Sequence, residues 1–292
     1  MLGPHCVAFI PASVPWFIAL ALSLLTGCFQ IPFETRARTF LQADHLLFAH
    51  RGASGRAREN SRAAFDLARQ EGADVLEIDL RLSKDQKAVV LHDDSLKRTH
   101  GIDQKVREMN AADLAAQDIL DLRAMLRRYR GRINMEIKDR NFRLADATWL
   151  AIREARAEER VLVGSFDRSV LAYFRHISGQ RVASSASAGE VLEFLLYCKT
   201  GYRPSFTRRQ SGGPATLPFD ALQLPARGLI DFSQSSFMSC AHESGLAVHF
   251  WTVNDPFHMV QLHLAGADGI MTDFPDLGKQ VGALITRVKN TH

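Results

Sequence analysis

Charged side chains are absent from the start of the chain. Residues 1–33 contain no Asp, Glu, Lys or Arg, which excludes this stretch from the polar surface of a folded domain. Within it, "PWFIALALSLLTGC" (residues 15–28) is an apolar run that ends in small residues, the layout of a secretory signal. We therefore expect residues 1–27 to form a leader and residues 28–44 a linker.

The end of that run, Leu25-Thr26-Gly27-Cys28, resembles the lipobox of bacterial lipoproteins, although a positively charged segment before the run is missing. The resemblance implies cleavage before Cys28, lipidation of its thiol, and an exported protein anchored to the membrane on its periplasmic or extracellular face. Two alternatives stay open. Residues 7–29 are long enough to span a bilayer as a retained anchor, and a plain signal peptide has the same apolar run.

Cysteine is scarce, with only Cys6, Cys28, Cys198 and Cys240 in the chain. None lies at the short paired spacing of a zinc site or a dithiol redox motif, which excludes both. Cys198 and Cys240 can pair outside the cytosol or remain two buried thiols, and the sequence leaves that choice open.

A glycine-rich phosphate loop and a concentration of positive charge are also missing. The segment Gly52-Ala53-Ser54-Gly55 lacks the spacing of a dinucleotide-binding loop. The net charge of +4 arises from scattered Lys and Arg, so nothing indicates a nucleic-acid partner. With 46% hydrophobic and 23% charged residues, the composition suits a folded domain with a large core.

Short apolar runs rich in Val, Ile and Leu alternate with longer helical patterns over most of the chain. We expect eight strands, at residues 46–50, 75–80, 133–138, 161–166, 181–185, 221–224, 247–253 and 269–272, and an extra strand at 88–92. Helical patterns separate them, for example at 61–73, where Ser61 is a good N-cap and Gly72 a typical stop, and at 146–160, with Asp146 near its start. Residues 200–218 are rich in turn formers and predict a long loop.

Eight such units predict a (β/α)8 barrel over residues 45–285, with an open doubly wound sheet as the alternative. Active sites of these barrels lie at the carboxyl ends of the strands, and polar residues of this chain occur there repeatedly. They are His50, Glu77, Asp79, His92, Glu136, Lys138, Trp251 and Asp273. Side chains two apart share a strand face, so Glu77 and Asp79 point the same way, and burying both favours a neutralising cation.

Three convergent carboxylates suit a hard divalent ion, Mg²⁺ or Ca²⁺, whereas zinc would recruit more His or Cys. Taken singly, each of these residues is as easily a salt-bridge partner or a hydrogen-bonded structural group. Their joint placement at successive strand ends is what indicates a site.

The stretch "AHRGASGRARENSRAAFDLARQEGADVLEIDLRLSKDQKAVVLHDDSLKRTHG" closely resembles the signature of glycerophosphodiester phosphodiesterases. The likeness continues through "INMEIK", "VGSFD", "AVHFWTVND" and "AGADGIMTDFPD", and spans roughly residues 46–278. The resemblance implies a metal-dependent hydrolase that releases sn-glycerol 3-phosphate and an alcohol from a glycerophosphodiester.

Carried over to this chain, the resemblance makes Glu77, Asp79 and Glu136 the ligands of one divalent cation. It makes His50 and His92 the acid–base pair, without saying which is the acid. Arg51 and Lys138 would face the phosphate, and Trp251 would form an apolar surface against the bound alcohol. Glu59 and Asn60 would position the residues that contact the substrate or the metal. The residue chemistry agrees, because a phosphodiester is an anion and histidine titrates in a useful range.

Two departures from the family pattern concern the substrate entrance. Arg58 stands where the family usually has proline, and we expect it to alter the rim. The segment between His92 and Glu136 is shorter than the usual insertion after the second strand. A shallower rim can admit a lipid-sized alcohol.

Three functions are therefore compared. The first is hydrolysis of small glycerophosphodiesters, and the second is a lysophospholipase D-like action on lysolipids, which the membrane anchor and short insertion favour. The third is a non-catalytic binding barrel, which the presence of both histidines and all three acids argues against. The oligomeric state stays open.

Overall fold

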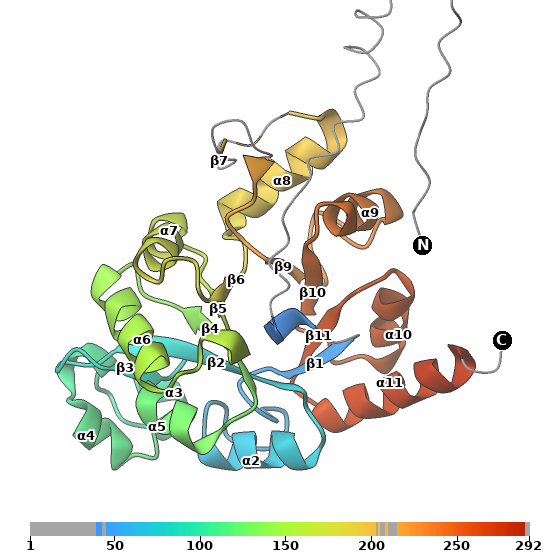
Figure 1. Ribbon diagram of the computed structural model, residues 1–292. Helices are drawn as coiled ribbons and strands as arrows, with labels where there is room; N and C mark the ends of the chain where they lie inside the picture. The colour runs from blue at the N-terminus through green and yellow to red at the C-terminus, as the bar shows by residue number, and fades with distance from the viewer. Residues whose placement is uncertain (1–38, 43–44, 203, 205–207, 210–214, 290–292) are drawn as a thin grey trace, which may run out of the picture. The chain divides into compact units, whose positions relative to one another are not determined.

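The computed structural model describes residues 39–42, 45–202, 204, 208–209 and 215–289 (Figure 1). The predicted leader, with Cys28, and most of the predicted linker lie outside the described residues. Within these ranges, no helix is both long and apolar enough to cross a membrane.

Eight parallel strands of the described chain form the barrel predicted from the sequence. In chain order they are β1 (Leu46–Ala49), β2 (Val75–Leu82), β4 (Arg132–Ile137), β5 (Val161–Gly164), β6 (Ala183–Ser184), β9 (Ala221–Pro225), β10 (Ala247–Trp251) and β11 (Gly269–Thr272). Neighbours in this order pair with one another from β1 to β6 and from β9 to β11. The first and last strands, blue and red in Figure 1, lie side by side with Leu46 opposite Gly269.

The remaining gap, between β6 and β9, is closed by a parallel bridge between Ser185 and Ala221. The backbone N–H of Ala186 donates to the carbonyl of Ala221 at 2.8 Å, and that of Asp220 donates to Ser184 at 2.8 Å. The sheet therefore returns on itself, and the open doubly wound alternative is wrong. β6 has only two residues, and for that reason its pairing with β9 reduces to a few bonds.

Helices follow the strands as a (β/α)8 barrel requires. They are α2 (Arg62–Gln70), α6 (Phe142–Glu154), α7 (Arg168–Ile177), α8 (Ala188–Thr200), α9 (Ser235–Glu243), α10 (Pro256–Leu264) and α11 (Pro275–Lys289), with short 3₁₀ turns at η1 (Thr39–Leu41) and η3 (Glu158–Arg160). Ser61 caps α2 as predicted, because its side chain accepts from the N–H of Ala64. The prediction for α6 began too late, since Asn141 and not Asp146 is its N-cap.

The insertion after β2 folds into a small layer of its own. It contains β3 (Ala88–Val90), α3 (Lys97–His100), η2 (Val106–Glu108), α4 (Ala111–Ala115) and α5 (Leu122–Arg128). The predicted extra strand is β3, which pairs antiparallel with β2 outside the barrel and ends two residues before His92. Buried Leu96, Val106 and Leu114 pack together beneath it.

The predicted loop at 200–218 begins where α8 ends. Its described part includes two strands of two residues each, β7 (Arg208–Arg209) and β8 (Ala215–Thr216), which pair antiparallel. A disulfide joins Cys198 on α8 to Cys240 on α9, with 5.9 Å between their Cα atoms. The sequence left this pairing open, and the structure shows the two cysteines bonded.

The inward faces of the strands change character along the barrel axis. At the amino-terminal end they are apolar, with Phe48, Val75 and Leu162 fully buried and Phe40 of η1 packed against this group. Further along the same faces the chain places polar groups such as Glu77, Asn134 and Gln223. Alternation along a strand fixes which side chains point inward, so this change in sequence builds a polar chamber above an apolar plug.

Candidate active site

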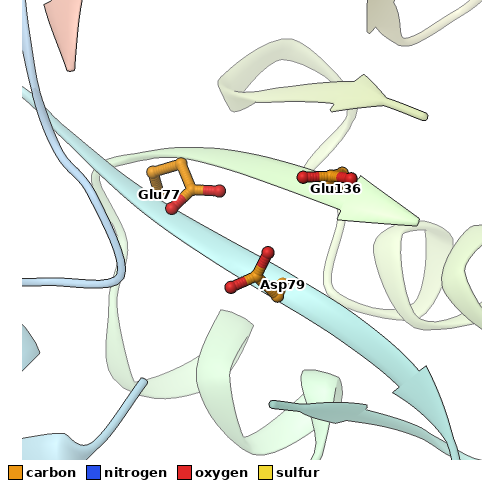
Figure 2. A group of neighbouring side chains, drawn as sticks. All are labelled: Glu77, Asp79 and Glu136. Carbon is orange, nitrogen blue, oxygen red and sulfur yellow. The ribbon is translucent and has the colours of Figure 1, made fainter. Parts of the chain in front are cut away.

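Three carboxylates meet on two neighbouring strands. Glu77 and Asp79 come from β2, and Glu136 from β4, where it is the register partner of Asp79 (Figure 2). One oxygen from each carboxylate lies within 4.8 Å of the other two. Glu77 is 4% exposed and Asp79 is 1% exposed, so the cluster is largely removed from water.

The cluster is electrostatically costly without added positive charge. Burial and the neighbouring charge of Asp79 raise the pKa of Glu77 to about 8. Burial also raises the pKa of Glu136, although Lys138 opposes that effect. Lys138 Nζ lies 3.1 Å from a Glu136 oxygen and 3.6 Å from Asp79, and Arg51 Nε lies 3.2 Å from Asp79. Three acids thus face two cations, and an all-oxygen donor set of this kind fits a hard divalent ion.

His50 directly follows β1 and is held by Asp273, which directly follows β11. Its Nδ1 lies 2.7 Å from an Asp273 oxygen, and because a carboxylate only accepts, Nδ1 carries the proton. Ser54 and Asn254 donate to the same carboxylate at 2.8 and 2.6 Å. Burial lowers the pKa of His50, but the Asp273 hydrogen bond and the charge of Glu77 outweigh it, so the net shift is upward.

Asp273 itself stays ionised. Burial tends to raise its pKa, but the hydrogen bond from His50 and the bonds from Asn254 and Ser54 bring it down to about 2. An anchored, charged Asp273 fixes the ring of His50 and leaves Nε2 to face the cavity.

His92 is held in the same way by the next residue in the chain. Its Nδ1 lies 2.7 Å from an Asp93 oxygen. Arg98 donates to Asp93 at 2.6 Å, and this contact lowers the pKa of the Asp93 carboxyl. Arg81 on β2 donates to the carbonyl of His92 at 2.9 Å, which anchors its backbone. The two histidines therefore each present Nε2, and in the described chain neither Nε2 has a hydrogen-bond partner.

The turn after β1 requires unusual backbone at Arg51 and Gly52. Gly52 has φ of 81°, and a Cβ there would lie 2.7 Å from the backbone of Ala64, so only glycine fits. The turn aims the N–H of Arg51 at Glu77, to which it donates at 2.8 Å. Glu59 accepts from the Arg51 guanidinium at 3.1 Å, while Asn60 donates to Asp79 at 2.9 Å.

These groups open on one cavity of about 640 Å³. Its polar side contains His50, Arg51, Glu77, His92, Glu136 and Lys138. Its apolar lining residues include Phe166, Val191, Leu192, Leu229, Phe232 and Trp251. Trp251 ends β10 and packs edge-on against Phe166, with ring centroids 6.0 Å apart. Leu229 is fully exposed and Phe166 is 59% exposed, so this wall continues outward to the cavity mouth.

The structure brings together the residues expected to act in catalysis, in phosphate binding and in metal binding, with Glu59 and Asn60 in contact with Arg51 and Asp79, whereas Cys28 lies outside the described residues. Arg58 is different: it does not line the cavity, and its guanidinium lies 3.2 Å from Asp118 on the outside of the barrel. The expectation that Arg58 alters the rim stays a prediction. Sequence reasoning also missed how the histidines are held. The signal was present, since Asp93 follows His92 and Asp273 follows the last strand.

A barrel with buried acids, two aspartate-held histidines and basic groups at one mouth defines a class of phosphate-ester hydrolases. The chain matches the model of the "Glycerophosphoryl diester phosphodiesterase family" over residues 50–277. It belongs to this family, and it is a phosphoric diester hydrolase.

Curated relatives agree with this membership, and a solved structure shares the fold. The chain is 33% identical over 245 residues to "Probable glycerophosphodiester phosphodiesterase 2" of Mycobacterium tuberculosis, covering 81% of this chain and 90% of that protein. It is 26% identical to a lysophospholipase D of Mus musculus, covering 78% and 82%. An Oleispira antarctica phosphodiesterase, solved with the product sn-glycerol-3-phosphate, has the same fold, with a TM-score of 0.65, 23% identity and coverage of 82% and 96%.

Proposed function

We propose that the chain hydrolyses glycerophosphodiesters to sn-glycerol 3-phosphate and an alcohol, with a bound divalent cation and histidine acid–base catalysis. The observation that carries this proposal is the convergence of three carboxylates and two histidine Nε2 atoms on one cavity. Membership of the family supports the reaction class.

Glu77, Asp79 and Glu136 would hold the cation, and Mg²⁺ or Ca²⁺ suits their oxygen ligands. When bound, the ion supplies positive charge against the phosphate oxygens. Arg51 and Lys138 contact the acids, and both line the cavity. Both would contact a phosphate bound in that cavity through charge-assisted hydrogen bonds.

The two histidines would move the protons. One Nε2 would take a proton from the attacking oxygen, either of water or of the substrate's own glycerol hydroxyl, as that oxygen bonds to phosphorus; in the second case water then opens the cyclic phosphate by the same proton transfers. The other Nε2 would give its proton to the oxygen of the leaving alcohol as the bond between that oxygen and phosphorus breaks. Asp273 and Asp93 keep each Nδ1 protonated, so each Nε2 is free to exchange its proton.

Purified protein tests this proposal directly. We expect cleavage of glycerophosphocholine with Mg²⁺ or Ca²⁺, loss of activity in chelator and recovery when metal is returned. Glu136→Gln should abolish metal-supported turnover, whereas Glu243→Gln on the exposed face of α9 should retain it. An active protein that is indifferent to chelator would refute metal dependence.

A second candidate, lysophospholipase D-like action on lysolipids, is favoured by the apolar wall of the cavity. Phe166, Leu192 and Leu229 are all at least half exposed and lie along one side of the mouth. Such a surface suits an alkyl chain better than a small polar alcohol. Equal or faster cleavage of lysophosphatidylcholine than of glycerophosphocholine would favour this function, and no cleavage of the lysolipid would rule it out.

We also propose that the chain is exported and held at a membrane through its N-terminus, with lipidated Cys28 as the anchor. The apolar run before Cys28 supports export. The Cys198–Cys240 disulfide agrees, because such bonds persist mainly outside the cytosol. Mass spectrometry of the mature N-terminus is the test: a diacylglycerol-modified Cys28 supports the proposal, and an unmodified Met1 contradicts it.

A further inference from the structure

The floor of the cavity carries a group of neutral polar side chains that the proposed chemistry does not use. Asn134 on β4, Gln223 on β9 and Ser185 after β6 all line the cavity. Asn134 is 3% exposed and Ser185 is 2% exposed, so these are interior groups that reach open space only through the cavity.

One hydrogen bond fixes the two amides. Nε2 of Gln223 donates to Oδ1 of Asn134 at 3.0 Å, a contact that crosses the barrel interior. In this arrangement the Gln223 oxygen remains an acceptor and the Asn134 nitrogen a donor. Within the part of the chain that the structure describes, neither of these atoms nor Ser185 Oγ has a hydrogen-bond partner. Buried polar groups usually have partners, so this set points to a ligand.

Gly164 at the end of β5 leaves the space in front of this group. A Cβ at Gly164 would lie 2.7 Å from Ser185 Oγ and 3.3 Å from the Gln223 oxygen. The two oxygens thus converge on one point beside Gly164. Any other residue there would fill the space that a ligand hydroxyl needs.

The floor adjoins the metal-binding acids. In the sheet register Asn134 is the partner of Glu77, and Gly164 is the partner of Glu136. The basic groups Arg51 and Lys138 contact the acids of this cluster, whereas the floor has no charge of its own. An uncharged set of donors and acceptors selects a neutral hydroxyl over a phosphate oxygen.

We propose that Asn134, Gln223 and Ser185 form a hydroxyl-binding subsite that recognises the glycerol part of the substrate. The inference rests on the proposed function, since it assigns one part of the same substrate to the floor. The Gln223 oxygen accepts a hydrogen bond from a glycerol hydroxyl, and the Asn134 amide N–H donates a hydrogen bond to the hydroxyl oxygen. The subsite makes the enzyme selective for glycerol diesters over diesters of simple alcohols.

Binding of two product-like ligands to the metal-loaded protein tests the subsite without turnover. Glycerol 3-phosphate and n-propyl phosphate share a charge and a chain length, but only the first has hydroxyls. By calorimetry we expect the wild type to prefer glycerol 3-phosphate by roughly tenfold to a hundredfold. Gln223→Met should reduce this ratio at least tenfold, and Ser185→Ala, the smaller change, should reduce it in the same direction. Gln261→Met, on the exposed face of α10, is the matched control and should retain the wild-type ratio.

The outcomes separate this inference from the proposed function. A wild type that binds the two ligands equally, or variants that keep the wild-type ratio, would overturn the subsite even if glycerophosphocholine is hydrolysed. Absence of glycerophosphocholine hydrolysis alongside a preference that Gln223→Met removes would overturn the proposed function and support the subsite. A thermal unfolding midpoint near that of the wild type shows that Gln223→Met is folded.

Discussion

Binding of Mg²⁺ or Ca²⁺ to the metal-free protein should release close to one proton at pH 7, and Glu77 is the group that loses it. The pKa of its buried carboxyl is about 8, so at pH 7 about nine tenths of the molecules carry the proton. A cation ligand must be a carboxylate, and the proton has to leave when the ion binds.

The size of the effect follows from the same pKa. Removing the proton at pH 7 costs about 1.4 kcal/mol, which weakens metal affinity roughly tenfold relative to a site that is already ionised. Each pH unit below pH 7 should weaken the metal affinity by about another factor of ten. Above pH 8 the affinity should level off, because the carboxyl is then ionised before the ion arrives.

Titration calorimetry measures both quantities. Repeating the metal titration at pH 7 in two buffers of different ionisation enthalpy gives the number of protons released, and titrations at pH 6, 7 and 8 give the slope. Glu77→Gln should bind more weakly and release no proton, while Glu243→Gln on the protein surface should match the wild type. An affinity that is constant from pH 6 to pH 8, with no proton release, would refute the reasoning.

Three further predictions concern groups around the site and the core. Asp273→Asn should lower turnover roughly a hundredfold. It should also move the His50-dependent limb of the pH–rate profile to lower pH, because the hydrogen bond that raises the pKa of His50 is weakened. An unchanged pH–rate profile would contradict this prediction. His249 is fully buried, with neither ring nitrogen bonded in the described chain, and burial lowers its pKa from 6.5 to about 4. Between pH 6.5 and pH 4, His249 therefore binds a proton in the unfolded state but stays neutral in the folded state. The free energy of unfolding should fall by about 3 kcal/mol over this range. Urea unfolding of His249→Asn should lack this loss, and an equal loss in both proteins would contradict the assignment. Replacing Cys198 and Cys240 by Ser should lower the free energy of unfolding by about 3–4 kcal/mol, because the disulfide joins residues 42 apart in sequence. Urea unfolding of the wild type in a reducing agent should show the same loss. An unchanged free energy of unfolding in both measurements would contradict this prediction.

The sequence was sufficient for the barrel because its strand pattern is strong and local. His50 directly follows β1, and Glu136 lies one residue before the carboxyl end of β4, where a barrel places its site. What it could not supply are contacts between distant parts of the chain. His50 and Asp273 are 223 residues apart in sequence, and only the pairing of β1 with β11 brings them together. The same limit applies to the contact of Arg58 with Asp118, which depends on how the insertion folds.

A difference in burial cost explains why the acids proposed to bind the metal are conspicuous in the sequence while the floor of the cavity is not. Two acids within one strand, Glu77 and Asp79, are so costly to bury that their presence predicts a neutralising cation. Asn134 and Gln223 cost far less, because one amide can satisfy another, and in a sequence they are indistinguishable from ordinary interior polar residues. The charged groups can therefore be found from sequence, whereas the neutral groups proposed to select the substrate are identified only when the folded barrel brings Asn134 of β4 into contact with Gln223 of β9. On this reasoning, differences in substrate choice between such enzymes are better sought in neutral floor and wall residues than among the charged ones.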